Sequence, residues 1–259
     1  MLSFRRGLER LRVGIYTQPA TLTVVGLSLF FFSVQQIAGS IPLAHGYTFG
    51  EVFTLLFGLN GALLLKGCFW QPLTYMFLHG GWGHLILNLL VLYFFGKALE
   101  RLLGSRRFLS IYFLGGIIAG FGWLGVTALM PLFPDIQGLT AWIPPEVRQL
   151  VESTFGLKIA APMPSFDQAF CLGASGGVFS LLGAFSAVVP DAAVYGFFLL
   201  IPFKLKARTL AIILVISTLA DALLIQSQVA YSAHLMGGVV GYVMGRLMRP
   251  RPALGEVKG

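Results

Sequence analysis

The stretch GASGGVF, residues 173–179, opens an apolar run that continues as SLLGAFSAVV to residue 189. Ser175 stands at the start of this run between small residues, which leave its hydroxyl unshielded. Backbone N–H groups at the start of a helix can also face an anion, so the position of Ser175 suits a nucleophile. The alternative is helix packing, because small residues spaced four apart are common where transmembrane helices touch. The motif alone favours packing, so a catalytic interpretation depends on partners elsewhere in the chain.

The composition is that of a polytopic membrane protein. Of the 259 residues, 56% are hydrophobic and 11% are charged, whereas an average soluble domain carries about 25% charged residues. Mean hydropathy is +0.82, and the length suits one compact helix bundle rather than two domains. The net charge of +8 lies in short segments between apolar spans, which indicates a role in topology and no nucleic-acid partner.

Six apolar segments predict an all-α, six-span bundle. Fifteen of the 18 Lys and Arg residues fall in the termini and in the second and fourth connections, which places both termini in the cytoplasm. The basic and then apolar N-terminus resembles a signal peptide, but its apolar run is nearly long enough to span, so we interpret it as a retained first span. The six segments are at about residues 20–37, 82–99, 108–130, 169–189, 207–225 and 233–247.

The predicted organisation is a cytoplasmic arm at 1–19, a membrane core at 20–247 and a cytoplasmic tail at 248–259. The first connection, residues 38–81, is too apolar for a solvated loop, so we expect short helices in the membrane interface beside the bundle. The third connection, residues 131–168, is an outer-face insertion with six prolines. A short amphipathic helix inside it either caps the bundle or contacts substrate, and capping is favoured because such helices usually just pack.

Polar residues stand near the start of the second and sixth spans. His84 and Asn88 are four residues apart, so they share a helical face that should point into the bundle. Both can donate a hydrogen bond to a developing oxyanion, and interhelical hydrogen bonding is the alternative. His234 stands on one face with Gly238, Gly241 and Gly245, and these glycines allow another helix to approach closely.

The predicted topology puts Ser175 and His234 at similar depth near the outer side of the membrane. A serine beside a neutral histidine is the minimal activated nucleophile. Metal binding competes for an intramembrane histidine, but no Asp, Glu or Cys cluster joins the histidines at ligand spacing, so we expect no metal and no cofactor. Cys68 and Cys171 are also outside any ligand spacing, and they could pair only if both face an oxidising compartment.

With these residues in place, the sequence closely resembles the rhomboid intramembrane serine proteases. The resemblance covers roughly residues 50–245, and its motifs occur in the right order on the right spans. Each motif is weak alone, and the set is highly specific. The motifs are Trp70-Gln71, His79, HLILN at 84–88, GKALE at 96–100, GASG at 173–176 and AHLMGG at 233–238.

The resemblance implies a Ser-His dyad in which Ser175 is the nucleophile and His234 its general base. It implies an oxyanion site made by His84, Asn88 and the backbone N–H of Ser175, and a water-filled cavity open to the outer face. It further implies that Glu100, with Arg101, anchors the first connection or the span ends. The residues with implied supporting roles are His79, Phe179, Gly173, Gly176, Gly238, Gly241, Trp70 and Glu100.

By the same resemblance, the partners are transmembrane protein substrates in the lipid bilayer, cut near their outer ends. Suitable substrate helices unwind easily, because a fully hydrogen-bonded helix hides its carbonyls. The compact core favours a prokaryotic plasma membrane. Two other functions remain open: a catalytically inactive rhomboid-like binder or chaperone of membrane proteins, and a small transporter. A transporter would need paired discontinuous helices and internal repeats, which the sequence does not display.

Three features depart from the common family pattern, and one residue raises a further question. Phe179 stands where many members carry tyrosine, Gln71 stands where arginine often follows the tryptophan, and the third connection is longer than in compact members. Asp221 is the only acidic residue well inside an apolar segment, so it invites a Ser-His-Asp triad. The resemblance points instead to a dyad.

Overall fold

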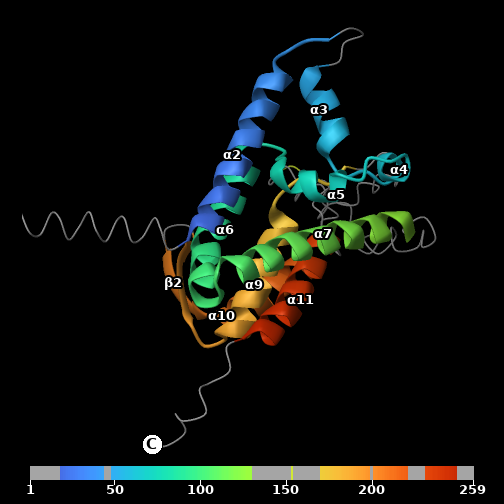
Figure 1. The fold of residues 1–259 in the computed structure, drawn as a ribbon. Coiled ribbons are helices and arrows are strands. Elements are labelled where there is room, and N and C mark those ends of the chain that lie inside the picture. The colour runs from blue at the N-terminus through green and yellow to red at the C-terminus, as the bar shows by residue number, and fades with distance from the viewer. Residues whose placement is uncertain are drawn as a thin grey trace, which may run out of the picture.

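The computed structural model shows a helix in each of the six predicted segments (Figure 1). It describes residues 18–43, 48–129, 153, 170–198, 201–220 and 231–249. By length and apolar composition, α2 and α7 can each cross a membrane, whereas α9 and α10 are shorter apolar helices. The number of spans therefore stays a prediction. The helices are α2 (Pro19–Gly39), α6 (Trp82–Leu103), α7 (Ser105–Leu129), α9 (Ser175–Val188), α10 (Ala207–Ala220) and α11 (Tyr231–Met248).

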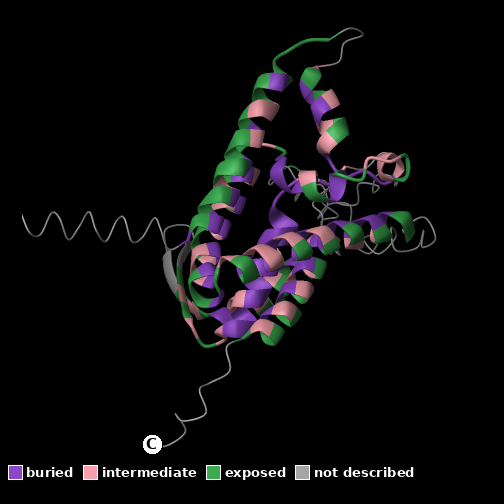
Figure 2. Cartoon of the chain, viewed as in Figure 1, coloured by how far each residue is buried: buried purple, intermediate pink, exposed green. Residues whose placement is uncertain are grey.

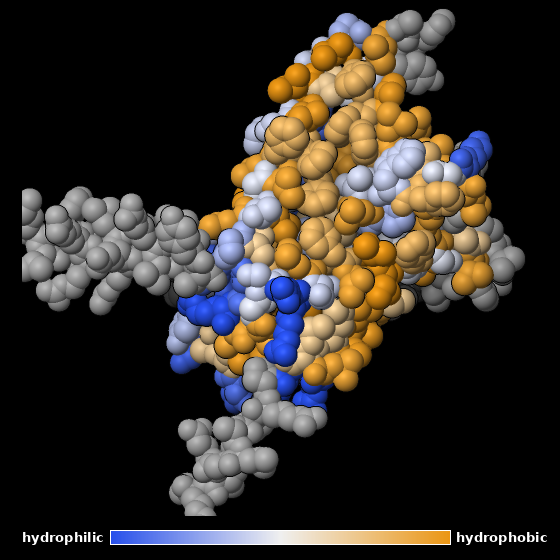
Figure 3. All heavy atoms as spheres, viewed as in Figure 1, coloured by the Kyte–Doolittle hydropathy of each residue, from blue (hydrophilic) through white to orange (hydrophobic). Residues whose placement is uncertain are grey.

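A two-stranded antiparallel hairpin differs from the all-helical expectation. Strand β1 (Ala193–Phe198) pairs with β2 (Ile201–Lys206), with Ala193 opposite Lys206. The hairpin occupies the fourth connection, where the sequence analysis predicted only a basic loop. Figure 3 shows hydrophilic surface gathered at this end of the bundle and apolar surface along the helices. The separation of the two surfaces agrees with the predicted membrane-facing sides and basic end.

The first connection contains the predicted short helices beside the bundle (Figure 1). Gln71 holds them together from a buried position: its amide nitrogen, Nε2, donates to the Leu55 carbonyl at 3.0 Å, and its Oε1 accepts from the Asn60 N–H at 3.1 Å. Gln71 thus makes local contacts at the position where many family members carry an arginine. The helices are α3 (Phe49–Phe57), α4 (Gly61–Leu65), α5 (Gln71–Thr74) and the 3-10 turn η2 (Tyr75–Phe77).

Helix α9 lies at the centre of the bundle, and most of its residues are buried (Figure 2). Its contact with α11 is too close for side chains: a methyl group on Gly241 would overlap the backbone of Ser180, and one on Gly245 would lie 2.7 Å from the Cα of Ala184. At the N-terminal end of α11 the close glycine is Gly237, which faces the backbone of Gly176. Gly238, which the sequence places on this face with Gly241 and Gly245, is also close to α9, because a methyl group on Gly183 would overlap its carbonyl oxygen.

Glu100 anchors the ends of two helices and does not reach the first connection. Its carboxylate accepts the backbone N–H groups of Ala20 and Thr21 at 3.0 and 2.8 Å, which caps the start of α2. It also accepts the hydroxyls of Thr21 and Ser105, each at 2.7 Å. An anion at a helix N-terminus is stabilised by the orphan N–H groups and the helix dipole. Arg101, its predicted companion, is exposed to solvent.

Replacing Glu100 with alanine should lower the free energy of unfolding by about 2–3 kcal/mol, because a buried cap with charge-assisted hydrogen bonds is lost. Equilibrium unfolding in detergent micelles measures this loss. The matched control is Arg101→Ala, on the next residue of the same helix, which should change stability by less than about 0.5 kcal/mol. Equal stabilities for the two variants would contradict the anchoring role.

Candidate active site

The chain turns sharply just before Ser175, at Gly173. Gly173 has φ +127°, a backbone conformation that L side chains rarely adopt, and its N–H donates to the carbonyl of Tyr75 at 2.9 Å. Two residues earlier, Cys171 pairs with Leu59 through hydrogen bonds of 2.9 and 3.1 Å. The segment before Ser175 is therefore extended and held by the first connection. For this reason α9 begins at Ser175 and not near residue 169, where the apolar pattern placed the start of the fourth span.

The first turn of α9 has no side-chain cap. Its N-cap residue is Ala174, which has no side-chain oxygen to accept a hydrogen bond from the N–H groups that follow. The first N–H groups of a helix have no partner inside the helix. Beside the Ser175 hydroxyl there are thus backbone donors that no capping side chain occupies, as an oxyanion site requires.

His84 lies next to this turn. A methyl group on Gly173 would come within 2.7 Å of Cε1 and 2.8 Å of Nε2 of His84, and within 3.7 Å of Oγ of Ser175. Glycine at 173 is thus needed both for its backbone angle and for the room that the imidazole takes. The other ring nitrogen, Nδ1, accepts the Gly80 N–H at 3.5 Å, which assigns the hydrogen to Nε2, the nitrogen beside Gly173.

His79 backs the ring of His84. The two ring centroids are 5.2 Å apart in an edge-on arrangement, and His79 is fully buried. Burial, together with a smaller effect of the nearby His84, lowers the pKa of His79 to about 4, so the ring is neutral at pH 7. Gln35 of α2 holds the His79 backbone from both sides, donating to its carbonyl at 2.9 Å and accepting its N–H at 3.1 Å.

Asn88 lies one helical turn after His84 and is buried. Its amide nitrogen, Nδ2, has no hydrogen-bond partner among the residues that the structure describes. A buried donor without a partner is costly, of the order of 1–3 kcal/mol, and in a native protein it calls for an explanation. A ligand oxygen that arrives only during turnover would supply that partner.

His234 lies against α9 through Phe179. The two rings are stacked, with centroids 4.3 Å apart and planes inclined by 2°. Phe179 is one turn after Ser175 on α9, so the stack fixes the imidazole against α9, and the missing tyrosine hydroxyl is not needed for it. Among the described residues no hydrogen bond joins Ser175 to His234, and such contacts are often loose before substrate binds.

Two of the predicted supporting residues lie away from this cluster. Trp70 is in the first connection, where its indole N–H donates to the Leu56 carbonyl at 2.8 Å, and Glu100 is near the opposite end of α6. Within the described ranges there is no group of three or more His, Cys, Asp or Glu residues that could hold a metal. Cys68 and Cys171 are both free thiols. Asp221, the possible third member of a triad, lies outside the described residues.

Tyr75 was missed by the sequence analysis, although it supports the site directly. Its hydroxyl donates to the Gly116 carbonyl at 2.6 Å, and the same oxygen would be 3.1 Å from a methyl group on Gly176. Its backbone carbonyl also accepts the N–H of Gly173. Tyr75 therefore joins the first connection to α7 and to the start of α9. No pattern within the first connection marks it, because its partners are distant in sequence.

Comparison with known proteins identifies the family of the chain. A family model described as the rhomboid domain matches residues 66–251, which is most of the chain. The chain therefore belongs to the rhomboid family, whose members are integral to membranes.

Similar proteins include two bacterial ones and one from a plant. The chain is 35% identical to Rhomboid protease GluP of Bacillus subtilis over 97 residues, which are 38% of this chain and 18% of that protein. It is 32% identical to Rhomboid protease AarA of Providencia stuartii over 109 residues, 42% of this chain and 36% of that protein. It is 26% identical to RHOMBOID-like protein 5 of Arabidopsis thaliana over 200 residues, which are 77% of this chain and 50% of that protein. The chain thus matches half or less of the length of each relative.

Proposed function

We propose that this chain is an intramembrane serine endopeptidase that hydrolyses peptide bonds in or near the transmembrane helices of other proteins. The observation that carries the proposal is the convergence around Gly173: the Ser175 hydroxyl, the uncapped start of α9 and the Nε2 side of His84 adjoin one small space. A nucleophile and oxyanion donors are the two parts that acyl transfer needs within about 3 Å of one reacting atom. Protease-named relatives support the same reaction class.

In the proposed reaction, Oγ of Ser175 attacks the carbonyl carbon of the scissile bond while His234 takes the hydroxyl proton. The carbonyl oxygen becomes an oxyanion, and it accepts hydrogen bonds from His84, Asn88 and the N–H of Ser175. His234 then gives its proton to the leaving nitrogen, which breaks the peptide bond and leaves an acyl ester on Ser175. Water, deprotonated by His234, hydrolyses the ester and restores both residues.

The proposed substrates are helices whose hydrogen bonds open easily near the outer side of the membrane. A peptide carbonyl within an intact helix is bonded to an N–H and is hidden from the nucleophile, so local unwinding must precede attack. We place both termini in the cytoplasm on the strength of the Lys and Arg distribution, and the compact core favours a prokaryotic plasma membrane.

The experiment is cleavage of a single-span substrate by the purified protein in liposomes. Two substrates are compared, one with Gly and Pro residues near its outer end and one with Leu at the same positions. We expect the first to be cut at one bond and the second to be cut at least tenfold more slowly, since its helix stays closed. The inactive binder, the second candidate from the sequence, would bind the first substrate and cut neither.

A further expectation concerns Asp221. In a serine-protease triad, neutralising the aspartate costs about 10⁴ in turnover. With a two-residue dyad, Asp221→Asn should keep activity within roughly tenfold, a change of about 1.4 kcal/mol. Initial rates on the cleavable substrate decide the matter, with circular dichroism as a control for folding. A loss close to that of a Ser175 variant would establish a triad.

A further inference from the structure

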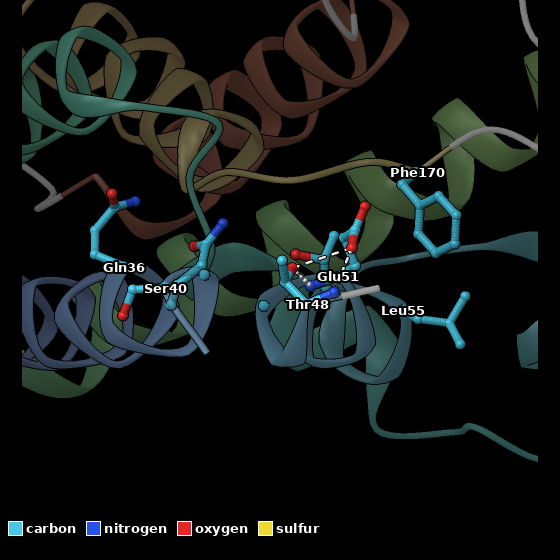
Figure 4. A pocket seen from close by; sticks show the side chains of 10 residues that line it. Gln36, Ser40, Thr48, Glu51, Leu55 and Phe170 are labelled. Carbon is cyan, nitrogen blue, oxygen red and sulfur yellow. Dashed lines mark hydrogen bonds between the residues drawn. The ribbon is translucent and has the colours of Figure 1, made fainter. Parts of the chain in front are cut away.

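A pocket lies apart from the proposed catalytic site, between the C-terminal end of α2 and helix α3. Its volume is about 760 Å³. Figure 4 shows side chains of α2 and of α3 around it, with Phe170 at one edge. The helices touch at its floor, where a methyl group on Gly50 would be 2.7 Å from the Cα of Gly39. The lining residues with polar side chains are Gln35, Gln36, Ser40, Thr48, Glu51 and Thr54.

Glu51 gives this pocket its charge. It is exposed and is the one charged residue among the described residues that line the pocket. One of its oxygens, Oε2, closes the capping box of α3 by accepting the N–H and the hydroxyl of Thr48 at 2.7 and 3.1 Å. Its other oxygen, Oε1, has no hydrogen bond among the described contacts. The pocket therefore presents a fixed carboxylate, with one face free, among neutral hydrogen-bonding groups.

The pocket is near the proposed nucleophile along the chain. Phe170, at its edge, precedes Ser175 by five residues, which span at most about 17 Å when extended. An extended peptide with its scissile bond at Ser175 would thus reach the pocket within about five residues. Gln35 adds a direct connection, because it lines the pocket and also holds the backbone of His79, the residue behind His84.

We propose that this pocket binds the extended segment of the substrate that flanks the cut bond on the outer side, and that it selects a Lys or Arg within about five residues of that bond. The neutral polar groups suit the free N–H and C=O groups of an unwound peptide, and Glu51 suits the cation. The inference rests on the proposed protease function for its substrate. It adds a specificity-determining carboxylate outside the catalytic residues.

Binding of transmembrane peptides to the Ser175→Ala protein in detergent tests this, with fluorescence anisotropy as the readout. The peptides carry Lys, Gln or Glu at each of five positions on the outer side of the cleavage site. We expect Lys at the best position to bind about three- to fivefold tighter than Gln, as suits an exposed ion pair. In Glu51→Gln that preference should disappear, while glutamine can preserve the capping box of α3. In Glu51→Lys, the Glu peptide should become the tightest of the three.

Asp191→Asn is the control, because it removes a carboxylate from beside Lys206 and Arg208, next to the β-hairpin. This variant should keep the Lys preference unchanged. A Lys preference that persists in Glu51→Gln, or no preference at any position with Glu51 present, would overturn the proposal. Because this assay measures binding without catalysis, its result is independent of the cleavage assay. If the wild-type protein cleaves but no Lys preference is found, only the proposed pocket is refuted. If a Lys preference is found but the wild-type protein does not cleave, only the proposed protease function is refuted.

Discussion

Cleavage of a transmembrane substrate is expected to fall by four or more orders of magnitude in Ser175→Ala and in His234→Ala. In the proposed mechanism no other group can form the acyl ester or carry the proton, and serine proteases lose comparable activity when either residue is removed. The double variant should be no worse than either single one, since the two residues act as a unit. Single-turnover assays in liposomes measure the loss. They must detect activities below about 0.01% of wild type, because the expected loss is four orders of magnitude or more.

Ser186→Ala is the matched control for the dyad. Ser186 lies on the same helix, is buried, and bonds only to the Gly183 carbonyl of its own helix, at 2.8 Å. Its removal should leave turnover within about twofold of wild type, since surrounding contacts are unchanged and such a bond contributes roughly 1 kcal/mol to stability. Substantial cleavage by a folded Ser175→Ala protein would remove Ser175 from the mechanism.

Asn88→Ala should lower kcat by about 10²–10³ and leave KM nearly unchanged, the second largest effect that we expect. Removing one oxyanion donor typically has this cost, because the hydrogen bond forms only as charge develops in the transition state. The unpartnered Nδ2 in the structure is the reason to expect it: nothing in the described resting protein depends on that donor. The variant should therefore fold with undiminished stability.

Full Michaelis curves for Asn88→Ala separate the two parameters. Leu87→Ala, on the neighbouring exposed position of α6, is the control and should change neither by more than about twofold. If Asn88→Ala instead raised KM and left kcat as in wild type, Asn88 would contribute to uniform substrate binding and not to the oxyanion site.

The helices could be predicted from the sequence because apolar runs of this length have few alternatives in a membrane protein. The start of α9 could not, because it depends on the pairing of Cys171 with Leu59, far away in the chain. The hairpin was missed for a related reason: the apolar pattern of the fourth connection did not separate strands from a loop. The row of glycines on α11 indicated the close contact with α9, but it did not reveal that Gly237 takes part in this contact as well.

In the candidate site, too, some residues could be predicted from the sequence and others could not. Ser175, His84, Asn88 and His234 could be named because each is a polar residue at the start of an apolar run. Tyr75 and Gln35 could not be named, because they act through backbone contacts with partners 41 and 44 residues away, respectively. Contacts of this kind leave no spacing in the sequence that a periodic pattern could reveal.

Labelling with a fluorophosphonate, followed by mass spectrometry, is the most direct test of whether Ser175 is an activated nucleophile. We expect one phosphonate adduct, on Ser175, in the folded protein in membranes. We also expect His234→Ala to reduce the labelling rate at least a hundredfold, because the general base is lost. No adduct on Ser175 in a folded protein would show that Ser175 is not an activated nucleophile, and equal labelling rates with and without His234 would show that His234 does not activate it.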